Sequence, residues 1–161
     1  MIRETRESDL EEVFNLIHAA FGNRPESDLV KQLISDGDVL INLLVESLDT
    51  IIGNVVVSKI TMEPDMGLLC GGIAPVSVLP DQQSSGVGSK LMTAAINESK
   101  KMGIDALFLL GDPNYYKRFG FIVSKLKTDY RVEHFQELVL TEDCLVNVKS
   151  KVTYANAFLN L

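Results

Sequence analysis

The chain has 161 residues, a length that predicts one domain spanning residues 1–161 with a complete apolar core. Its 46% hydrophobic and 23% charged residues are typical of a globular protein and argue against disorder. The 15 basic and 22 acidic residues leave a net charge of −7, which disfavours nucleic-acid binding and favours a cationic partner. No apolar run approaches the roughly 18 residues that span a bilayer, and no secretory signal follows the charged N-terminus, so we expect a cytoplasmic protein without a membrane partner.

The cysteine and histidine residues argue against a disulfide framework and against a metal site. Cys70 and Cys144 are two in number, and neither has a neighbour at the spacing of metal ligands. His18 and His134 are far apart in the sequence. We therefore expect reduced thiols and no metal, with Cys70 as a buried, unreactive side chain in a long apolar run.

The N-terminal third predicts one strand and two helices. Residues 2–5 form the expected strand, and apolar residues at helical spacing then run to Gly22. Ser8 and Glu11 have the spacing of a capping box, in which Ser8 would cap the first helix. A second helix is expected from near Ser27 to Gly37.

The middle of the chain predicts an antiparallel hairpin followed by a strand–helix–strand unit. Residues 39–46 and 51–60 are rich in β-branched side chains and are separated by a short turn. The nearly uncharged run 68–79 predicts a buried central strand, which Pro75 must break or bulge. Further expected elements are a helix that ends at Gly103 and strands at 106–110, 135–140 and 148–154. This order predicts an α+β fold, because strands and helices do not alternate regularly.

The loop after the central strand has a composition suited to phosphate binding. Small residues between Gln83 and Gly88 lead directly into a helix, so backbone N–H groups and the helix dipole could hold a polyanionic ligand. A plain glycine-containing connector is the alternative interpretation. A dinucleotide-binding fingerprint is disfavoured, because Leu91 occupies the position of its third glycine, and no Gly-Lys-Ser/Thr sequence is present for a P-loop.

A second polar segment follows the strand at 106–110. Asp112 and Pro113 have the pattern of an N-cap and first helical residue, and they open a short helix that carries Tyr115 and Tyr116. Ligands of open α/β sheets bind just outside the carboxyl ends of strands, so a tyrosine here could donate a proton. Aromatic packing against the sheet is the alternative.

Together the two motifs resemble those of the GNAT superfamily of acetyl-CoA-dependent N-acetyltransferases. Gln83 to Gly88 matches the family's Gln/Arg-x-x-Gly-x-Gly/Ala motif, and Tyr116 to Phe121 matches its Tyr-x-x-x-Gly-Phe ending. The Gly-Asp-Pro-x-Tyr-Tyr-x-Arg-Phe-Gly-Phe segment is similar to one bacterial subgroup of that family. The resemblance implies a mixed, mostly antiparallel sheet flanked by helices, with one parallel strand pair that splays apart.

The resemblance also implies roles for individual residues. Val76, Ser77 and Val78 would pair through their backbone with the pantetheine arm of acetyl-CoA, and Asn114 would hydrogen-bond that arm. Tyr116 would protonate the departing thiolate. The backbone amides that would hold the pyrophosphate belong to Gln83, Ser84, Ser85, Gly86, Val87 and Gly88. Arg118 and Lys117 would lie near the 3′-phosphate or would be solvated.

The implied reaction is transfer of an acetyl group from acetyl-CoA to the amine of a small molecule or peptide. A strand amide near Val76 would stabilise the oxyanion. The central strand lacks an acidic residue, so the general base is unassigned, and Glu46, Glu63 and Asp65 are candidates by rough location only. A non-catalytic acyl-CoA sensor and an enzyme that uses another acyl-CoA are the alternatives. The acceptor and the oligomeric state, including a homodimer, are left open.

Overall fold

The computed structural model describes residues 1–22 and 25–160, and it shows the expected α+β architecture. Eight strands form one sheet in the order β1-β2-β3-β4-β5-β7-β6, with β8 paired to β3. Among the strand pairs of the described residues, β4–β5 is parallel and the others are antiparallel. The strands are β1 (Ile2–Glu4), β2 (Val39–Ser47), β3 (Thr50–Glu63), β4 (Cys70–Val78), β5 (Ala106–Leu110), β6 (Ile122–Val123), β7 (Phe135–Val139) and β8 (Lys151–Tyr154).

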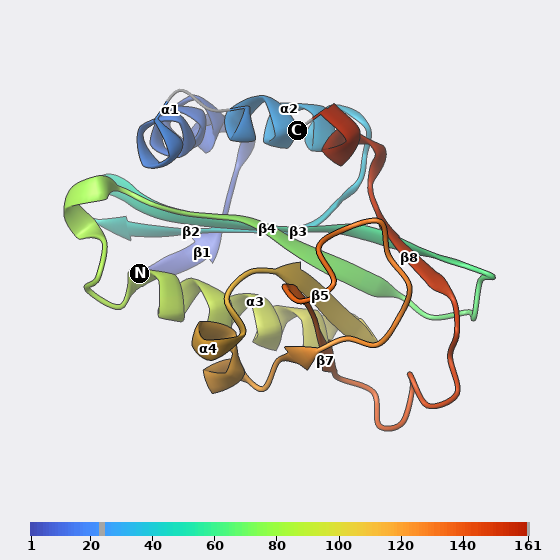
Figure 1. Cartoon of the computed structure of the whole chain (residues 1–161). Coiled ribbons are helices and arrows are strands. Elements are labelled where there is room, and N and C mark those ends of the chain that lie inside the picture. The colour runs from blue at the N-terminus through green and yellow to red at the C-terminus, as the bar shows by residue number, and fades with distance from the viewer. Residues whose placement is uncertain (23–24, 161) are drawn as a thin grey trace.

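Helices cover both faces of this sheet (Figure 1). The helices are α1 (Leu10–Phe21), α2 (Glu26–Ser35), α3 (Val87–Met102) and α4 (Pro113–Tyr116), with 3₁₀ turns η1 (Glu7–Asp9), η2 (Pro80–Gln82), η3 (Lys117–Phe119) and η4 (Asn156–Asn160). One apolar cluster lies between α3 and strands β2–β5, and a second lies under α1 and α2. A third joins β5, β7 and β8. In the described part of the chain, no helix is long and apolar enough to cross a membrane.

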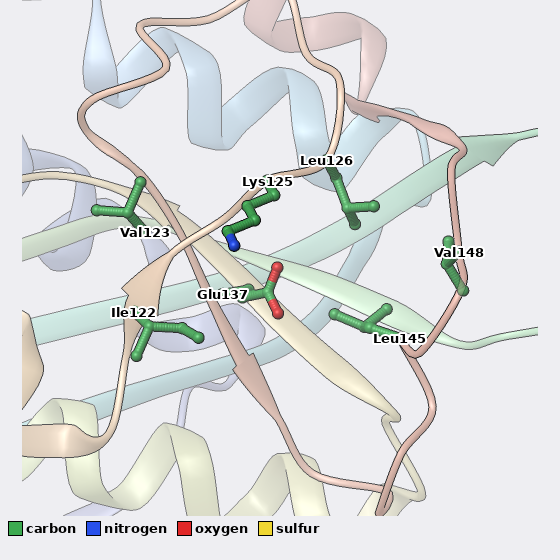
Figure 2. Close-up of a pocket in the computed structure, with 7 residues that line it drawn as sticks. All are labelled: Ile122, Val123, Lys125, Leu126, Glu137, Leu145 and Val148. Atoms are coloured by element: carbon green, nitrogen blue, oxygen red, sulfur yellow. The ribbon is translucent and has the colours of Figure 1, made fainter.

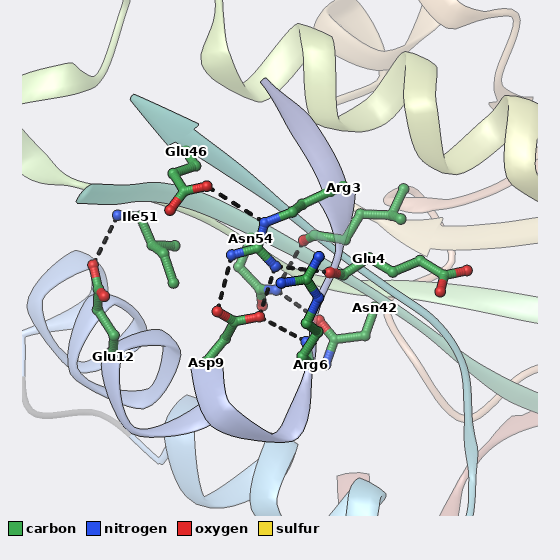
Figure 3. Close-up of polar contacts among 10 residues, drawn as sticks. Arg3, Glu4, Arg6, Asp9, Glu12, Asn42, Glu46, Ile51 and Asn54 are labelled. Atoms are coloured by element: carbon green, nitrogen blue, oxygen red, sulfur yellow. Dashed lines mark hydrogen bonds and ion pairs between the residues drawn. The ribbon is translucent and has the colours of Figure 1, made fainter. Parts of the chain in front are cut away.

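The start of α1 differs from the predicted capping box. Ser8 lies inside η1 rather than at a helix cap, and α1 begins at Leu10. Asp9 Oδ2 instead accepts a hydrogen bond from the Arg6 backbone N–H at 2.7 Å. The Arg3 guanidinium donates to both Asp9 carboxylate oxygens at 2.7 and 2.9 Å (Figure 3). These bonds hold Asp9 at the end of η1, and the prediction of Ser8 as the cap was wrong because Ser8 lies within that turn.

Two differences concern the C-terminal third. The last strand begins at Lys151 rather than near Val148, and it pairs with β3 at Ile60 to Glu63. The two-residue strand β6 was not predicted, because two residues carry no detectable periodicity. The other predicted strands and helices agree with the structure to within three residues at each end.

The predicted interruption at Pro75 is a bulge in β4. Val76 lies opposite Val55 and Ile73 lies opposite Val57, so Ala74 and Pro75 together oppose only Val56. Such an insertion bends the strand and locally disrupts its pairing. The bend is the feature of the fold that shapes the candidate site.

Candidate active site

Strands β4 and β5 pair over three residues and then separate. Gly72 opposite Phe108 is the last paired position, and it lies just before the bulge. Beyond it, β5 continues to Leu110 while pairing only with β7. The edge of β4 from Ile73 to Val78 that faces β5 is therefore left without a strand partner, and a V-shaped opening results.

The unpaired edge of β4 presents backbone groups to this opening. The Leu79 N–H donates to Ile52 O of β3 at 3.0 Å. Because backbone groups alternate between the two edges of a strand, Val78 and Val76 direct theirs away from β3. The Gln83 side-chain amide donates to Val78 O at 3.2 Å, which agrees with that direction. Ser77 directs its backbone to β3, and its buried hydroxyl has no hydrogen-bond partner in the described residues.

The loop that follows β4 places a helix N-terminus at the mouth of the opening. Ser84 and Gly86 adopt positive φ values of 62° and 91°, and Gly86 directly precedes α3. The Ser85 hydroxyl donates to Gln82 O and ties the turn together. The first amides of an α-helix have no acceptor within the helix, so those of Val87, Gly88 and Ser89 are available to an anion, whereas Lys90 N donates to Gly86 O.

The β5–α4 segment packs against this loop. Asp112 caps α4 by accepting a hydrogen bond from Asn114 N at 2.9 Å, as predicted. The Tyr115 hydroxyl lies 3.4 Å from the Ser89 hydroxyl of α3. The Arg118 guanidinium stacks 4.2 Å from the centre of the Tyr115 ring, and its Nε donates to Tyr115 O at 2.8 Å.

These contacts bring the two sequence motifs together around one pocket. The pocket has a volume of about 380 Å³. Its lining residues are Val78, Gln83, Ser84, Gly86, Gly88, Ser89, Tyr115 and Arg118. Sequence reasoning did not include Ser89 or Tyr115 in this group. Their proximity depends on how α4 folds back on α3, and no local pattern encodes that packing.

The adjacent tyrosines point in different directions. The two rings stand edge to face, with centres 4.8 Å apart and an interplanar angle of 88°. The Tyr116 ring is half-buried against Gly111 and Phe121, and a Cβ at Gly111 would overlap it. Burial, together with the neighbouring Tyr115, raises the pKa of Tyr116 above its usual range. The Tyr116 hydroxyl therefore stays protonated at physiological pH and can act as a proton donor.

Three further residues singled out in the sequence, Asn114, Lys117 and Cys70, differ in their burial. Asn114 is exposed on α4, and Lys117 is exposed in η3. Cys70 is buried at the start of β4, and burial, followed by the charges of Cys144 and Asp105, raises its pKa to about 12. Such a thiol is protonated at physiological pH and is a poor nucleophile.

None of the three acidic candidates for the general base lines the pocket. Glu46 accepts a hydrogen bond from Arg3 Nε at 3.4 Å on the far side of β3 from β4. Glu63 lies opposite Lys151 of β8 in the strand register at the end of β3, well past the bulge that faces Val56. Asp65 accepts a hydrogen bond from Gly67 N in the following loop.

Comparison of the chain with known protein families gives a match over most of its length. A family model described as an acetyltransferase (GNAT) domain matches residues 1–124. The chain belongs to the GNAT family of N-acetyltransferases. The resemblance seen in the sequence motifs and the expected fold are thus confirmed.

Relatives in sequence and structure lie within the same family. YjhQ of Escherichia coli K12, an uncharacterized N-acetyltransferase, is 32% identical over 120 residues, which are 73% of this chain and 66% of YjhQ. The crystal structure of the GNAT protein YhbS from E. coli in complex with CoA superposes with a TM-score of 0.91 at 26% identity, covering 99% of this chain and 91% of YhbS. A Brucella melitensis GNAT acetyltransferase in complex with acetyl-CoA gives a TM-score of 0.84 at 29% identity, covering 98% of this chain and 97% of that one.

Proposed function

We propose that residues 1–161 form one domain that transfers an acetyl group from acetyl-CoA to a primary amine by direct attack. The observation that carries the proposal is the unpaired edge of β4, which opens beside a helix N-terminus. A pantetheine arm needs backbone partners, and a pyrophosphate needs convergent N–H groups. Both are present within one opening, and similar folds with CoA or acetyl-CoA bound support this assignment.

In this proposal acetyl-CoA lies along β4 and across the loop between β4 and α3. Val76 and Val78 would direct backbone groups to the pantetheine arm, with the Gln83 amide giving up its hydrogen bond to Val78 O where needed, and Ser77 between them holds β4 to β3. The residues whose amides would surround the pyrophosphate are Gln83, Ser84, Ser85, Gly86, Val87 and Gly88. Asn114 lies at the start of α4, where it would reach the pantetheine arm.

The transfer moves one acetyl group and one proton. The neutral amine attacks the thioester carbonyl carbon, and the Val76 N–H would stabilise the negative charge that develops on the carbonyl oxygen. The C–S bond breaks, and Tyr116 would give its proton to the departing thiolate. The acceptor amine loses a proton to solvent or to a base outside the three acidic candidates considered above.

Binding and turnover test the proposal separately. Acetyl-CoA at 100 times its dissociation constant should stabilise the protein by about 2.7 kcal/mol, which is a shift in Tm of roughly 5–10 °C for a domain of this size. NAD should give no shift. No shift with any acyl-CoA at millimolar concentration would refute the central claim.

The turnover assay compares acetyl-, propionyl- and succinyl-CoA with a panel of primary amines, using mass detection of the acylated product. Acetylated product from acetyl-CoA supports the enzyme. Binding without any product supports an acyl-CoA sensor instead. Preferential turnover of propionyl- or succinyl-CoA would change the donor but keep the reaction class.

A further inference from the structure

A second pocket lies at the β6–β7 end of the sheet, away from the acetyl-CoA opening. Its volume is about 330 Å³, and it shares no lining residue with the pocket beside α3. Glu137 at its centre is the cross-strand neighbour of Phe108, which in turn pairs with Gly72 at the apex of the opening. Two strand spacings of about 4.8 Å place Glu137 roughly 10 Å from that apex along the sheet.

The walls of this pocket are aliphatic and partly open to solvent. The wall residues are Ile122, Val123, Leu126, Leu145 and Val148. Ile122 and Val123 are 64% and 45% exposed, although both are large apolar side chains. An exposed apolar surface of this kind commonly marks a binding site. The volume is at the lower end of the range of roughly 300–1,000 Å³ for ligand pockets, which suits a small metabolite.

Two opposite charges line the same pocket, with Glu137 half-buried and Lys125 exposed to solvent. Figure 2 shows the Lys125 ammonium group and the Glu137 carboxylate pointing toward the middle of the pocket. Glu137 Oε1 accepts a hydrogen bond from the buried Ser124 hydroxyl at 2.6 Å, which fixes the carboxylate. In the described part of the chain, Glu137 Oε2 makes no hydrogen bond and Lys125 forms no ion pair.

We propose that this pocket binds a free α-amino acid with an aliphatic side chain. The ammonium group of the ligand would meet Glu137, its carboxylate would meet Lys125, and its side chain would contact the aliphatic walls. Each charged group of the protein thereby gains an opposite partner, and charge-assisted hydrogen bonds of this type are stronger than neutral ones. A simple amine would contact Glu137 alone, and a simple carboxylate would contact Lys125 alone, so the zwitterion gains one charged contact more than either.

The test is a calorimetric titration of the full chain with leucine, isopentylamine and 4-methylpentanoate. The last two are leucine analogues that keep the aliphatic group and only one of its charges. We expect saturable binding of leucine, with each analogue at least tenfold weaker. Glu137→Gln and Lys125→Met should each weaken leucine binding at least tenfold, because each removes one charge and keeps the approximate side-chain length.

Two controls make the result decisive. Glu142→Gln neutralises an exposed carboxylate that does not line the pocket, and it should leave leucine affinity unchanged. The Tm and the acetyl-CoA-induced shift of Glu137→Gln should match those of the unsubstituted protein, since a glutamine oxygen can still accept from Ser124. The proposal is overturned if leucine shows no saturable binding at 10 mM, if isopentylamine binds as tightly as leucine, or if Glu137→Gln binds leucine normally. Each outcome is independent of whether the protein transfers an acetyl group.

Discussion

The two halves of the sheet differ in how completely their polar groups are paired. Around β1–β3 the polar groups are cross-linked between distant segments, as Figure 3 shows for Arg3, Asp9 and Glu46. The Glu12 carboxylate likewise accepts a hydrogen bond from Ile51 N at 2.8 Å, which ties α1 to β3. Along β4 the pairing with β5 stops after three residues.

We infer from this difference that one half contributes mainly to stability and the other to the proposed binding of acetyl-CoA. An unpaired backbone group costs free energy when it is buried away from water, so an open strand edge persists where water or a ligand can satisfy it. We call β1–β3 and the segments cross-linked to them the closed half. The open half is β4 beyond Gly72 with the loop and α4 beside it, where backbone groups of β4 have no strand partner on the β5 side. Substitutions in the open half should therefore change catalysis and binding first, and those in the closed half should change stability first.

The largest expected effect comes from Tyr116→Phe. This change keeps the ring and its packing on Gly111 but removes the proposed proton donor. We expect kcat to fall by about 10²–10⁴-fold, with little change in acetyl-CoA affinity, because the hydroxyl acts on charge that develops in the transition state. Steady-state kinetics and a binding titration measure the two quantities.

Tyr115→Phe is the matched control for that variant. Tyr115 lines the pocket beside α3, so its loss should raise the KM for acetyl-CoA modestly and leave kcat within a few-fold. If Tyr115→Phe instead reduces kcat more than Tyr116→Phe, the roles of the two tyrosines are reversed. Full activity in both variants would remove tyrosine from the mechanism.

Gly86→Val should abolish most of the acetyl-CoA-induced thermal shift. Gly86 has φ +91°, a conformation that a β-branched residue rarely adopts, so the loop would change shape. Gly37→Val introduces similar strain at φ +73° outside the opening and should leave the shift intact. An equal loss of the shift in both variants would attribute the effect to general destabilisation.

Gly111→Ala should reduce both the stability and the catalytic rate. The new Cβ would overlap the Tyr116 ring, so the ring or the strand end must move. We expect a loss of about 1–3 kcal/mol in the free energy of unfolding and a fall in kcat. Urea denaturation and steady-state assays test the two effects, and an unchanged kcat would show that Gly111 does not position Tyr116.

The smallest effect is expected from Asp9→Asn in the closed half. The Arg3 hydrogen bonds, followed by the Arg6 backbone N–H, lower the pKa of Asp9 to about 2. A carboxyl whose pKa is lowered by folding contributes stability above its usual pKa near 4, and that contribution disappears as the pH falls toward 2. The variant should therefore lose under about 1 kcal/mol at pH 7 and show a flatter stability profile between pH 4 and 2.

Urea denaturation across that pH range measures the Asp9 contribution. The matched control, Asp49→Asn, replaces an exposed carboxylate in the β2–β3 turn. Equal flattening of the profile by both variants would contradict the assignment to the Arg3 pair. Acetyl-CoA binding should be the same in all three proteins.

The sequence alone determined the family, the order of most elements and the interruption at Pro75, and the structure decided that this interruption is a bulge. The GNAT motifs around Gly86 and Gly120 are local, and they could be recognised without any tertiary contact. Pro75 carries no N–H and cannot join an ordinary central ladder, so its position in an apolar run was sufficient to predict the interruption. The cap of α4 at Asp112 was also predictable, because its hydrogen bond reaches only two residues along the chain.

Tertiary structure decided what depends on residues far apart in the chain. Arg3 holds both Asp9 and Glu46, which are 37 residues apart, and no local capping pattern at Ser8 contains these ion pairs. The packing of α4 on α3 placed Tyr115 beside Ser89, and the fold of the C-terminal third gathered Lys125, Glu137 and Leu145 into one pocket. Local hydrogen bonds and periodicities can be read from neighbouring residues, whereas these contacts exist only after the strands have paired and the helices have packed on them.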